Sequence, residues 1–470
     1  MQGKKAEAQE TIRYIQQIDP LDYWSAAEAS LSASQGASFL KTGTNHNSKG
    51  IIAVQELLEV VTNYMTIGAT KDALALLDGA IAIGEPYASY PLMYYYKAYN
   101  LQKENNQAEA TSCMEKAKQL SPLNNYPFRL EEIGMFEDLL KTSPDDPYLQ
   151  YHLGNLLYYL GQKESGLDHW KLSADLNPSF AIACRNVGFG YGRLNELDNA
   201  IKYYDLAIQA NPNDPLLLTE SDKICEQANI AEAQRLKRLE AHLKTVMKHD
   251  DAVMRLLTLY NAAGQYDKAI KILDNRHFHL WEGGGQVHDI YVDSHMLKLL
   301  KGKRYKEAIR EFDLANQYPV NLEVAPSPGG GYEAKVYYLS GVAYEAMNQA
   351  DKARECFEKS ANTEFRNRLT DLNYYKVKSL RKLNKNKEAD AALSEIQKSL
   401  ERMQKNLMDS YAKFGEANQN VQQSNILYYS GLIHLLENKP AAANAEFKQA
   451  IELYPGNIWA KLMNEEAFRL

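Results

Sequence analysis

Residues 146–212, DPYLQYHLGNLLYYLGQKESGLDHWKLSADLNPSFAIACRNVGFGYGRLNELDNAIKYYDLAIQANP, contain two successive copies of one pattern. The positions that the copies share are small residues and a closing proline, at Gly154, Gly166 and Pro178 in the first copy and at Gly188, Ala200 and Pro212 in the second. Pro178 and Pro212 therefore lie one period of 34 residues apart (212 − 178). Small residues at fixed spacing indicate two helices that approach closely, and the proline marks where the second helix ends.

This period and pattern are typical of the tetratricopeptide repeat, a helix–turn–helix unit that stacks on copies of itself. Nine segments of the chain match it, and an N-terminal half unit and an irregular helical hairpin add to them. The sequence therefore predicts an all-α fold, a right-handed superhelical solenoid of about nine to eleven helix–turn–helix repeats.

The repeats divide the chain into three predicted parts. Residues 1–214 form an N-terminal array that starts with a half repeat at 4–19, and we expect either a longer chain or a partner to cover the exposed apolar face of that helix. Residues 215–250 are an irregular helical connector with longer helices expected at 215–228 and 230–249, and the Arg and Lys residues of the second helix are expected to face solvent. Residues 251–470 form a C-terminal array that carries two loops, at 277–289 and 321–332, and a long helix at 391–412 between its last two repeats.

Composition excludes several classes of protein. The net charge of −7 and the pI of about 5.9 argue against a nucleic-acid-binding protein, and no apolar run is long enough for a membrane span. The first residues, MQGKKAEAQETIRYIQ, contain no apolar core of a signal peptide, so the compartment stays open between cytoplasm and periplasm. The four cysteines are scattered without a CxxC pair, which predicts buried free thiols.

The predicted groove of the solenoid is aromatic. The chain has 32 tyrosines against 12 phenylalanines, and many fall on the first helix of a repeat, which lines the groove. The groove positions are Tyr95, Tyr99, Tyr148, Tyr151, Asn155, Tyr158, Tyr159, Ile182, Arg185, Phe189, Arg193, Tyr338, Glu345, Asn425 and Tyr428. Such walls suit an extended peptide or a helix, and they also suit sugar rings. Alternatively, individual tyrosines pack between repeats.

Some proteins of this fold hold a terminal carboxylate with lysines and asparagines at set groove positions. Asn155 and Asn186 occupy two of those positions, but Tyr151 stands where the first lysine is needed. The sequence therefore predicts that this carboxylate clamp is absent.

No catalytic motif, cofactor-binding motif or standard metal-ligand spacing occurs in the chain. The densest group of polar and aromatic residues lies in one loop and comprises Arg276, His277, His279, Trp281, Glu282, His288 and Asp289. The three histidines fit no standard zinc spacing, so no metal is predicted there. A Trp beside a carboxylate could contact a sugar, or the loop could be anchored by His and Trp packing.

The loop sequence HFHLWEGGG (277–285) resembles the motif HFHPWEGGE of a family of bacterial tetratricopeptide proteins. Further stretches resemble that family in the same order over most of residues 5–365, namely YPFRLEEI (126–133), DDPYLQYHLGNLLY (145–158), CRNVGFGY (184–191), RLKRLE (235–240), HDD (249–251) and YPVNL (318–322). Two positions depart from the motif, because Leu280 replaces Pro and Gly285 replaces the second Glu. If that Glu bears on an activity of the family, this chain is impaired or specialised.

The resemblance implies repeats that follow an N-terminal β-sandwich domain of unknown function, in bacteria that degrade carbohydrates, and hence a role in glycan metabolism. It also singles out Arg129, Glu131, Arg185, Asn186, His277, His279, Trp281 and Glu282.

Two functions are expected from these observations. The first is a non-catalytic scaffold whose aromatic concave groove binds a protein or peptide partner, for which the β-sandwich domain is one candidate. The alternative is the sugar-binding helical half of a carbohydrate-active protein, in which Glu131 and Glu282 face the sugar. The candidate binding residues are Arg129, Glu131, Tyr151, Asn155, Arg185, Asn186, His277, His279, Trp281 and Glu282, with no catalytic residue, cofactor or metal.

Overall fold

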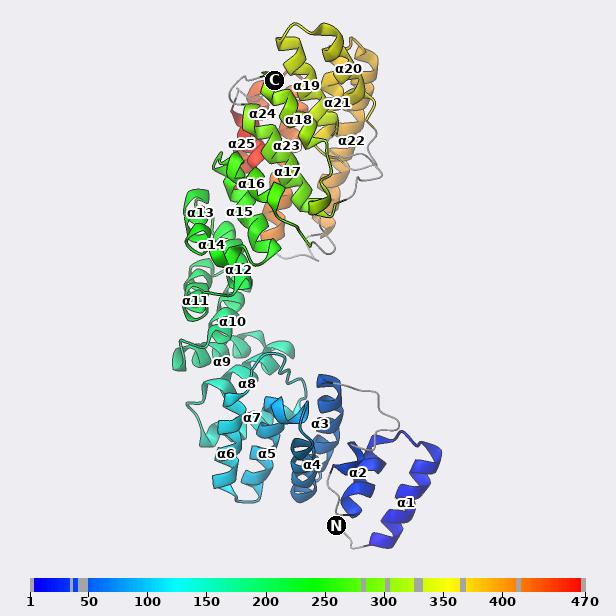
Figure 1. The fold of residues 1–470 in the computed structure, drawn as a ribbon, viewed down its shortest axis with the longest axis vertical. Helices are drawn as coiled ribbons and strands as arrows, with labels where there is room; N and C mark the ends of the chain where they lie inside the picture. Colours follow the sequence, from blue (N-terminus) through cyan, green and yellow to red (C-terminus); the bar gives the residue numbers. More distant parts are fainter. Residues whose placement is uncertain are drawn as a thin grey trace. The chain divides into compact units, whose positions relative to one another are not determined.

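Antiparallel helical hairpins make up the chain in the computed structural model (Figure 1). The structure describes residues 4–33, 37–40, 50–279, 285–300, 305–324, 333–363, 369–410 and 416–465. All regular secondary structure in these ranges is helical, as predicted. Within them, no helix has the length and apolar character that crossing a bilayer requires. The chain divides into two units, Met1–Asn211 and Pro212–Leu470, which are described separately below.

In its described part, the N-terminal unit consists of eleven α-helices and two short 3-10 turns. They are α1 (Lys5–Ile18), α2 (Tyr23–Ser32), η1 (Ser38–Leu40), α3 (Ile51–Thr66), α4 (Thr70–Ile83), η2 (Tyr87–Ser89), α5 (Pro91–Lys103), α6 (Gln107–Gln119), α7 (Glu131–Thr142), α8 (Pro147–Tyr159), α9 (Lys163–Leu176), α10 (Ala181–Arg193) and α11 (Leu197–Ala210). Four hairpins match the predicted repeats: α3–α4, α5–α6, α8–α9 and α10–α11.

The close approach predicted from the small residues is present in both central hairpins. A Cβ atom added to Gly188 would lie 2.8 Å from the Tyr204 ring, and one added to Gly154 would lie 2.5 Å from the Trp170 ring. Glycine is therefore needed at these two crossings, because a larger residue would push the helices apart. Helix α8 begins where Asp146 accepts hydrogen bonds from the backbone N–H groups of Tyr148 and Leu149.

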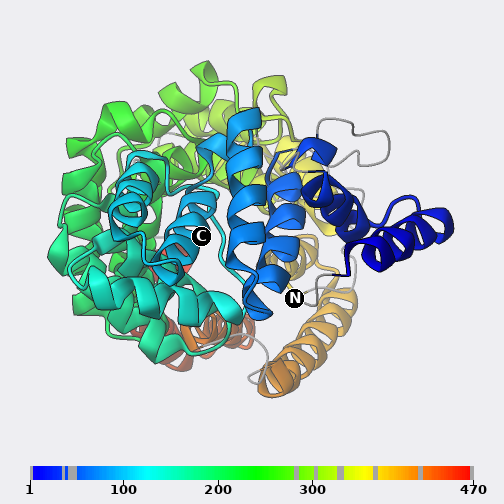
Figure 2. The same ribbon diagram turned by 90° about the horizontal axis from the view of Figure 1, so that it is seen from below.

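Helix α1 packs on α2 and is buried at one position, Ile12. Its other large apolar side chains face solvent, with Tyr14 63% and Ile18 68% exposed. Figure 2 shows α1, in dark blue, at the margin of its unit. A hydrophobic core cluster of this unit runs from Ala27 of α2 to Leu157 of α8 and includes no residue of α1.

The C-terminal unit consists of fourteen α-helices and one 3-10 turn within the described residues. They are α12 (Pro215–Gln227), α13 (Glu232–Ala241), α14 (Leu243–Val246), α15 (Asp250–Ala262), α16 (Tyr266–Asn275), α17 (Gly285–Leu300), α18 (Tyr305–Ala315), η3 (Val320–Leu322), α19 (Glu333–Ala346), α20 (Ala350–Ala361), α21 (Leu372–Lys382), α22 (Asn386–Ser410), α23 (Glu416–Leu436), α24 (Pro440–Leu453) and α25 (Ile458–Asn464).

Three details of this unit differ from the sequence prediction. The helix expected over 230–249 breaks at His242 into α13 and α14. The long helix expected at 391–412 begins at Asn386, so one 25-residue helix also serves as the second helix of its repeat. Residues 285–289, predicted as loop, are the start of α17.

A buried ionic network joins α12, α13 and α15. Arg235 donates hydrogen bonds to both carboxylate oxygens of Asp222, at 2.9 and 2.8 Å, and Arg255 Nε donates to Asp222 Oδ2 at 2.6 Å. Glu226 accepts from both arginines. The expectation that the basic residues of this segment face solvent is therefore wrong for Arg235, whose side chain is 4% exposed. Asp222 and Glu226, four residues apart on α12, together supply the negative charge that balances the two arginines.

The last helix, α25, packs against helices far earlier in the chain. Trp459 Nε1 lies 3.3 Å from Asp293 Oδ2 on α17, and Lys335 Nζ on α19 lies 2.9 Å from the centre of the indole ring. Lys461 Nζ lies 2.6 Å from Glu232 Oε1 on α13. Leu462 packs on Leu297, with Tyr266, Ile458 and Trp459 around them. The unit is thus fastened by contacts between its last helix and helices α13, α16, α17 and α19.

Candidate functional site

The segment before α7 is extended, and its side chains alternate between the interior and solvent. Asn125, Pro127 and Arg129 are buried. Tyr126 and Phe128, between them, are 59% and 41% exposed. This alternation is the geometry of an extended chain, in which successive side chains point to opposite sides. The buried residues therefore fix the segment, and two aromatic rings stand on its outer side.

Arg129 anchors this segment to the preceding repeats. Its Nε donates to Glu59 Oε2 at 2.8 Å, and Nη1 and Nη2 donate to the side-chain and backbone oxygens of Gln55 at 2.7 and 2.8 Å. Nη1 also lies 3.3 Å from Glu132 Oε1. These contacts use the guanidinium within the protein, so Arg129 positions its neighbours Tyr126 and Phe128.

Glu132, which sequence analysis did not single out, completes the anchor. Its Oε2 accepts from the backbone N–H groups of Phe128 and Arg129, and its Oε1 accepts from the Tyr96 hydroxyl at 2.7 Å. The predicted residue beside it, Glu131, is exposed at the start of α7. The three-residue spacing of Arg129 and Glu132 could have indicated this ion pair, because residues three apart can meet at the start of a helix.

A pocket of about 520 Å³ opens beside the extended segment. Four predicted residues line it, namely Tyr151 and Asn155 from α8 and Arg185 and Asn186 from α10. The remaining lining residues are Tyr126, Pro127, Phe128, Tyr159 and Ile182. The structure therefore brings together four of the ten candidate residues, with Arg129 directly behind Phe128, over whose ring its guanidinium carbon lies at 4.3 Å.

The polar side of the pocket is an ordered network. Asn155 Oδ1 accepts hydrogen bonds from Trp170 Nε1 at 2.8 Å and from Asn186 Nδ2 at 3.1 Å. Asn186 Oδ1 accepts from Arg185 Nη1 at 3.2 Å. Burial raises the pKa of Tyr151, and a hydrogen bond with Asn155 partly opposes this shift. The amides are thus fixed, and Arg185 brings a positive charge to the lining.

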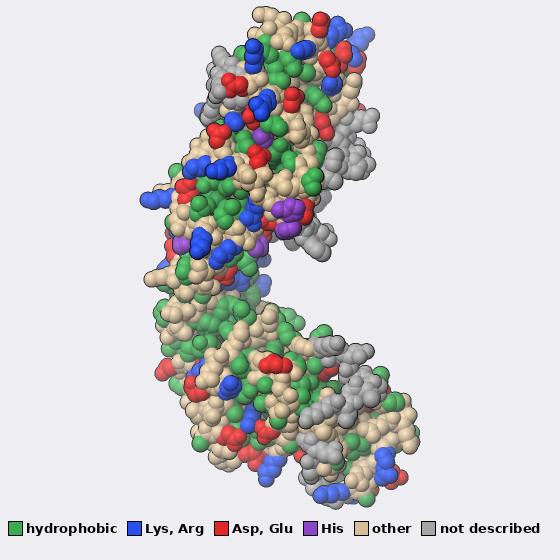
Figure 3. Space-filling model, in the orientation of Figure 1, with side chains coloured by type: hydrophobic (Ala, Val, Ile, Leu, Met, Phe, Trp, Pro, Cys, Tyr) green, Lys and Arg blue, Asp and Glu red, His purple; other side chains and the backbone are tan. Residues whose placement is uncertain are grey.

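The rim of the pocket is aromatic and exposed. Tyr159 is 70% exposed and Phe189, one turn beyond Arg185, is 36% exposed. The Arg185 guanidinium carbon lies 5.4 Å from the centre of the Phe189 ring. Figure 3 shows hydrophobic side chains, in green, gathered over the α8 to α11 part of this unit. A group of exposed aromatic rings beside a pocket is typical of an interaction surface.

Several groove tyrosines are core residues instead. Tyr95 and Tyr338 are fully buried, and Tyr428 is 5% exposed. Tyr158 is half-buried and stacks on Trp170 of its own repeat, with ring centres 4.6 Å apart. Packing inside the unit, the second interpretation, therefore accounts for Tyr95, Tyr338 and Tyr428, and the exposed aromatic surface is smaller than the sequence predicted.

His152 lies beneath Tyr151, surrounded by the rings of Tyr95, Phe136 and Tyr151. Burial lowers its pKa from 6.5 to about 3, so it stays neutral in the folded protein. In the unfolded chain it takes up a proton below about pH 6.5. We therefore expect the stability of the N-terminal unit to fall as pH drops from 6.5 towards 3, by up to about 1.4 kcal/mol per pH unit.

The measurement is native-state hydrogen exchange of the α8 amides at pH 7 and pH 5. The variant His152→Gln places an amide near Asn125 that can replace the hydrogen bond of the imidazole but cannot be protonated, so its loss of protection over this interval should be smaller by about 2 kcal/mol. Equal losses in both proteins would show that other groups cause the pH dependence.

The remaining predicted residues belong to the C-terminal unit. His277 and His279 lie on the extended residues that follow α16, while Trp281 and Glu282 lie outside the described residues. His288 is buried, stacks on Tyr318 and lies 2.9 Å from the Gln317 carbonyl oxygen. It is thus kept away from the surface where His277 and His279 are exposed.

Comparison with known proteins agrees with this architecture. The tetratricopeptide-repeat family model matches residues 187–214 and 334–364. The chain is an all-α solenoid of tetratricopeptide repeats, and such repeats serve as protein-interaction scaffolds.

Among solved structures, the chain is similar to YrrB, a TPR protein with an unusual peptide-binding site, with 15% identity, a TM-score of 0.27, and coverage of 48% of this chain and 91% of that one. It is also similar to the human IFIT1 dimer with PPP-AAAA, with 14% identity, a TM-score of 0.27, and coverage of 92% and 95%. A third similar structure is PilF of Pseudomonas aeruginosa, with 14% identity, a TM-score of 0.19, and coverage of 65% and 88%. Likenesses at this level concern the fold alone.

Proposed function

We propose that the N-terminal unit is a non-catalytic docking scaffold, whose pocket binds a peptide segment of a partner protein. The segment carries an apolar side chain next to a carboxylate. The observation that carries this proposal is the meeting of Tyr151, Asn155, Arg185 and Asn186 in one pocket beneath an exposed aromatic rim.

The size and lining of the pocket support an apolar side chain. A volume of about 520 Å³ falls in the range of well-formed ligand sites, and most of its lining is aromatic or apolar. Tyr126 and Phe128 stand on an anchored segment, so little ordering is needed when a ligand arrives. Rigid aromatic residues on a rim are the usual anchors of protein interfaces.

The polar residues favour a carboxylate over a sugar. Arg185 supplies a guanidinium, which pairs with carboxylates through a planar fork of donors. The amides of Asn155 and Asn186 are committed to each other, to Trp170 and to Arg185. A sugar needs several donors and acceptors for its hydroxyl groups, and amides whose oxygens already accept hydrogen bonds from within the protein offer fewer acceptors.

The resemblance to the bacterial tetratricopeptide family suggests one source for the peptide. If the chain acts with a β-sandwich domain in bacterial glycan metabolism, an exposed loop of that domain is a candidate for the segment. The protein would then act through assembly, and any sugar chemistry would belong to the partner.

The test uses peptides selected by display against the full chain, with affinity measured by fluorescence polarisation. Selected peptides should share an aromatic or aliphatic residue next to Asp or Glu. Tyr159→Ala and Arg185→Ala should each weaken binding at least about tenfold, because truncating an anchor residue at the centre of an interface costs about 2 kcal/mol or more. The Arg185→Ala loss should shrink for a peptide in which Asn or Gln replaces the acid.

Tyr14→Ala is the matched control, since Tyr14 is a similarly exposed tyrosine of the same unit on α1, outside the pocket. This variant should bind as the parent does. Binding that survives both pocket variants, or a saccharide that competes with the peptide and depends on Arg185, would contradict the proposal.

A further inference from the structure

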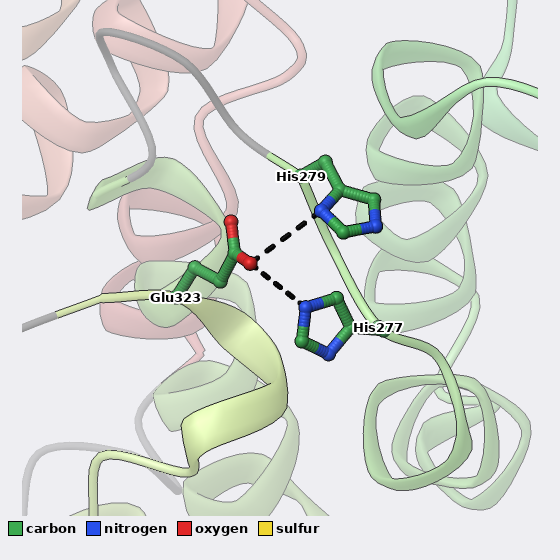
Figure 4. A group of neighbouring side chains, drawn as sticks. All are labelled: His277, His279 and Glu323. Atoms are coloured by element: carbon green, nitrogen blue, oxygen red, sulfur yellow. Dashed lines mark hydrogen bonds and ion pairs between the residues drawn. The ribbon is translucent and has the colours of Figure 1, made fainter.

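His277, His279 and Glu323 form a compact group on the surface of the C-terminal unit (Figure 4). His277 Nε2 lies 2.8 Å from Glu323 Oε1, and His279 Nδ1 lies 3.4 Å from the same oxygen. One ligand atom from each residue lies within 4.8 Å of the other two. Across the described residues, this is the one group of three or more His, Cys, Asp or Glu side chains that meets this condition.

The two imidazoles point the same way because the chain between them is extended. Residues two apart on an extended chain face the same side, and the residue between them faces the other. That residue is Phe278, which is fully buried. Its burial fixes both His277 and His279 outward, with ring centres 4.6 Å apart.

Hydrogen bonds to the rest of the unit hold the histidine segment. Asp250, at the start of α15, accepts from the His279 backbone N–H at 2.8 Å and from Arg276 Nε at 2.7 Å. Arg276 also donates to the Met247 carbonyl oxygen at 2.8 Å. Both ends of the short segment are therefore attached to the same helix start.

A second set of bonds brings Glu323 to the histidines. The Asn321 side chain donates to the carbonyl oxygens of Leu273 and Arg276, at 2.7 and 2.8 Å. The Asn321 carbonyl oxygen accepts from the Phe278 backbone N–H at 2.8 Å. Glu323 itself has a φ of 51°, in the left-handed region. A glutamate rarely adopts this conformation, and such local cost is often found at functional positions.

We propose that His277, His279 and Glu323 form a binding site for a divalent transition-metal cation of the Zn²⁺ type. Two imidazole nitrogens and one carboxylate oxygen are a ligand set that suits Zn²⁺, whereas Mg²⁺ and Ca²⁺ prefer oxygen ligands alone. Three protein ligands leave a fourth position for water or for a ligand atom from another molecule. This site lies in the other unit from the peptide pocket and stands independently of it.

The present spacing needs only small adjustments. Bonds of about 2.0–2.1 Å in a tetrahedral site place ligand atoms roughly 3.3 Å apart. The Glu323 oxygen and His277 Nε2 would separate by about half an ångström, and the most distant pair would close by about 1.5 Å, which side-chain rotation on the exposed surface can supply. The anchored backbone would not need to move.

The experiment titrates Zn²⁺ into the untagged, reduced full chain after treatment with a chelator, and measures heat and stoichiometry. We expect one equivalent bound at micromolar or lower concentration, together with a higher melting temperature, because a metal that binds only the folded state stabilises it. Co²⁺ in place of Zn²⁺ should give the visible absorption of a tetrahedral site.

Three variants test the ligands, His277→Ala, His279→Ala and Glu323→Gln. Each should weaken Zn²⁺ binding at least about tenfold, and circular dichroism should show an unchanged fold since all three side chains are exposed. His434→Ala is the matched control, because His434 lies near Glu437 and Glu446 in the same unit but has no second imidazole in such a group. Zn²⁺ binding that none of the three ligand variants reduces, or that His434→Ala reduces equally, would overturn the assignment, as would no binding at all.

Discussion

The variant Arg129→Ala is expected to lose about 3–5 kcal/mol of stability in the N-terminal unit and to lose peptide binding with it. The Arg129 side chain is 6% exposed and that of Glu132 is fully buried. Removing the guanidinium leaves the Glu132 carboxylate in the interior without its positive partner. It also frees Gln55 and Glu59 from the segment that carries Tyr126 and Phe128.

Chemical denaturation followed by the α7 and α8 amides in hydrogen exchange measures this loss. A double variant separates the unpaired charge from the lost anchor. Arg129→Ala with Glu132→Gln removes the unpaired charge but does not restore the contacts that Arg129 made. The double variant should recover part of the stability and little of the peptide binding. Arg193→Ala, on the exposed end of α10, is the control and should change stability by less than about 0.5 kcal/mol. A loss for Arg129→Ala no larger than that of the control would refute the buried-anchor interpretation.

The variant Asp222→Ala is expected to destabilise the C-terminal unit by a similar amount, about 3–5 kcal/mol. Asp222 is 3% exposed and binds both Arg235 and Arg255, and these arginines hold its pKa below the usual range even though burial raises it. Without Asp222, two arginines share the single carboxylate of Glu226. The interior then carries an excess positive charge, whose desolvation is no longer offset.

The thermal transition of the full chain checks this prediction, and the part assigned to the C-terminal unit should fall by roughly 10 °C. Asp390→Ala is the control, because Asp390 is exposed on α22. Since the pKa of Asp222 is lowered in the folded state, its contribution is present above the unfolded pKa near 3.8 and is lost as pH falls below it. A parent protein and an Asp222→Ala variant of equal stability at pH 7 would contradict the role of the network.

The sequence was most informative where interactions are local. The spacing of Gly154, Gly188 and their closing prolines predicted hairpins that the structure contains, because close helix contacts within one repeat leave a fixed pattern. The same regularity placed four pocket residues on the groove face of adjacent repeats, because stacked repeats share one geometry. These residues are Tyr151, Asn155, Arg185 and Asn186.

The remaining parts of the sites depend on contacts that no repeat pattern encodes. Glu323 joins His277 from 46 positions away, through a turn that follows no consensus. Arg129 contacts Gln55 across 74 positions. The sequence alone does not distinguish a buried arginine from a solvent-exposed one. Glu131 and Glu132 differ only in which side of the α7 start they face, and that depends on the extended segment before it.

The attachment of α25 to early helices changes how the C-terminal unit should gain its structure. Stacked repeats usually contact only their neighbours, so they can form one hairpin at a time. Here Trp459 meets Asp293 across 166 positions and Lys461 meets Glu232 across 229 positions. Contacts of such long range slow folding, because the chain loses the entropy of a large loop before they form. We therefore expect slow, all-or-none formation of the C-terminal unit, which stays incomplete on the ribosome until α25 has emerged.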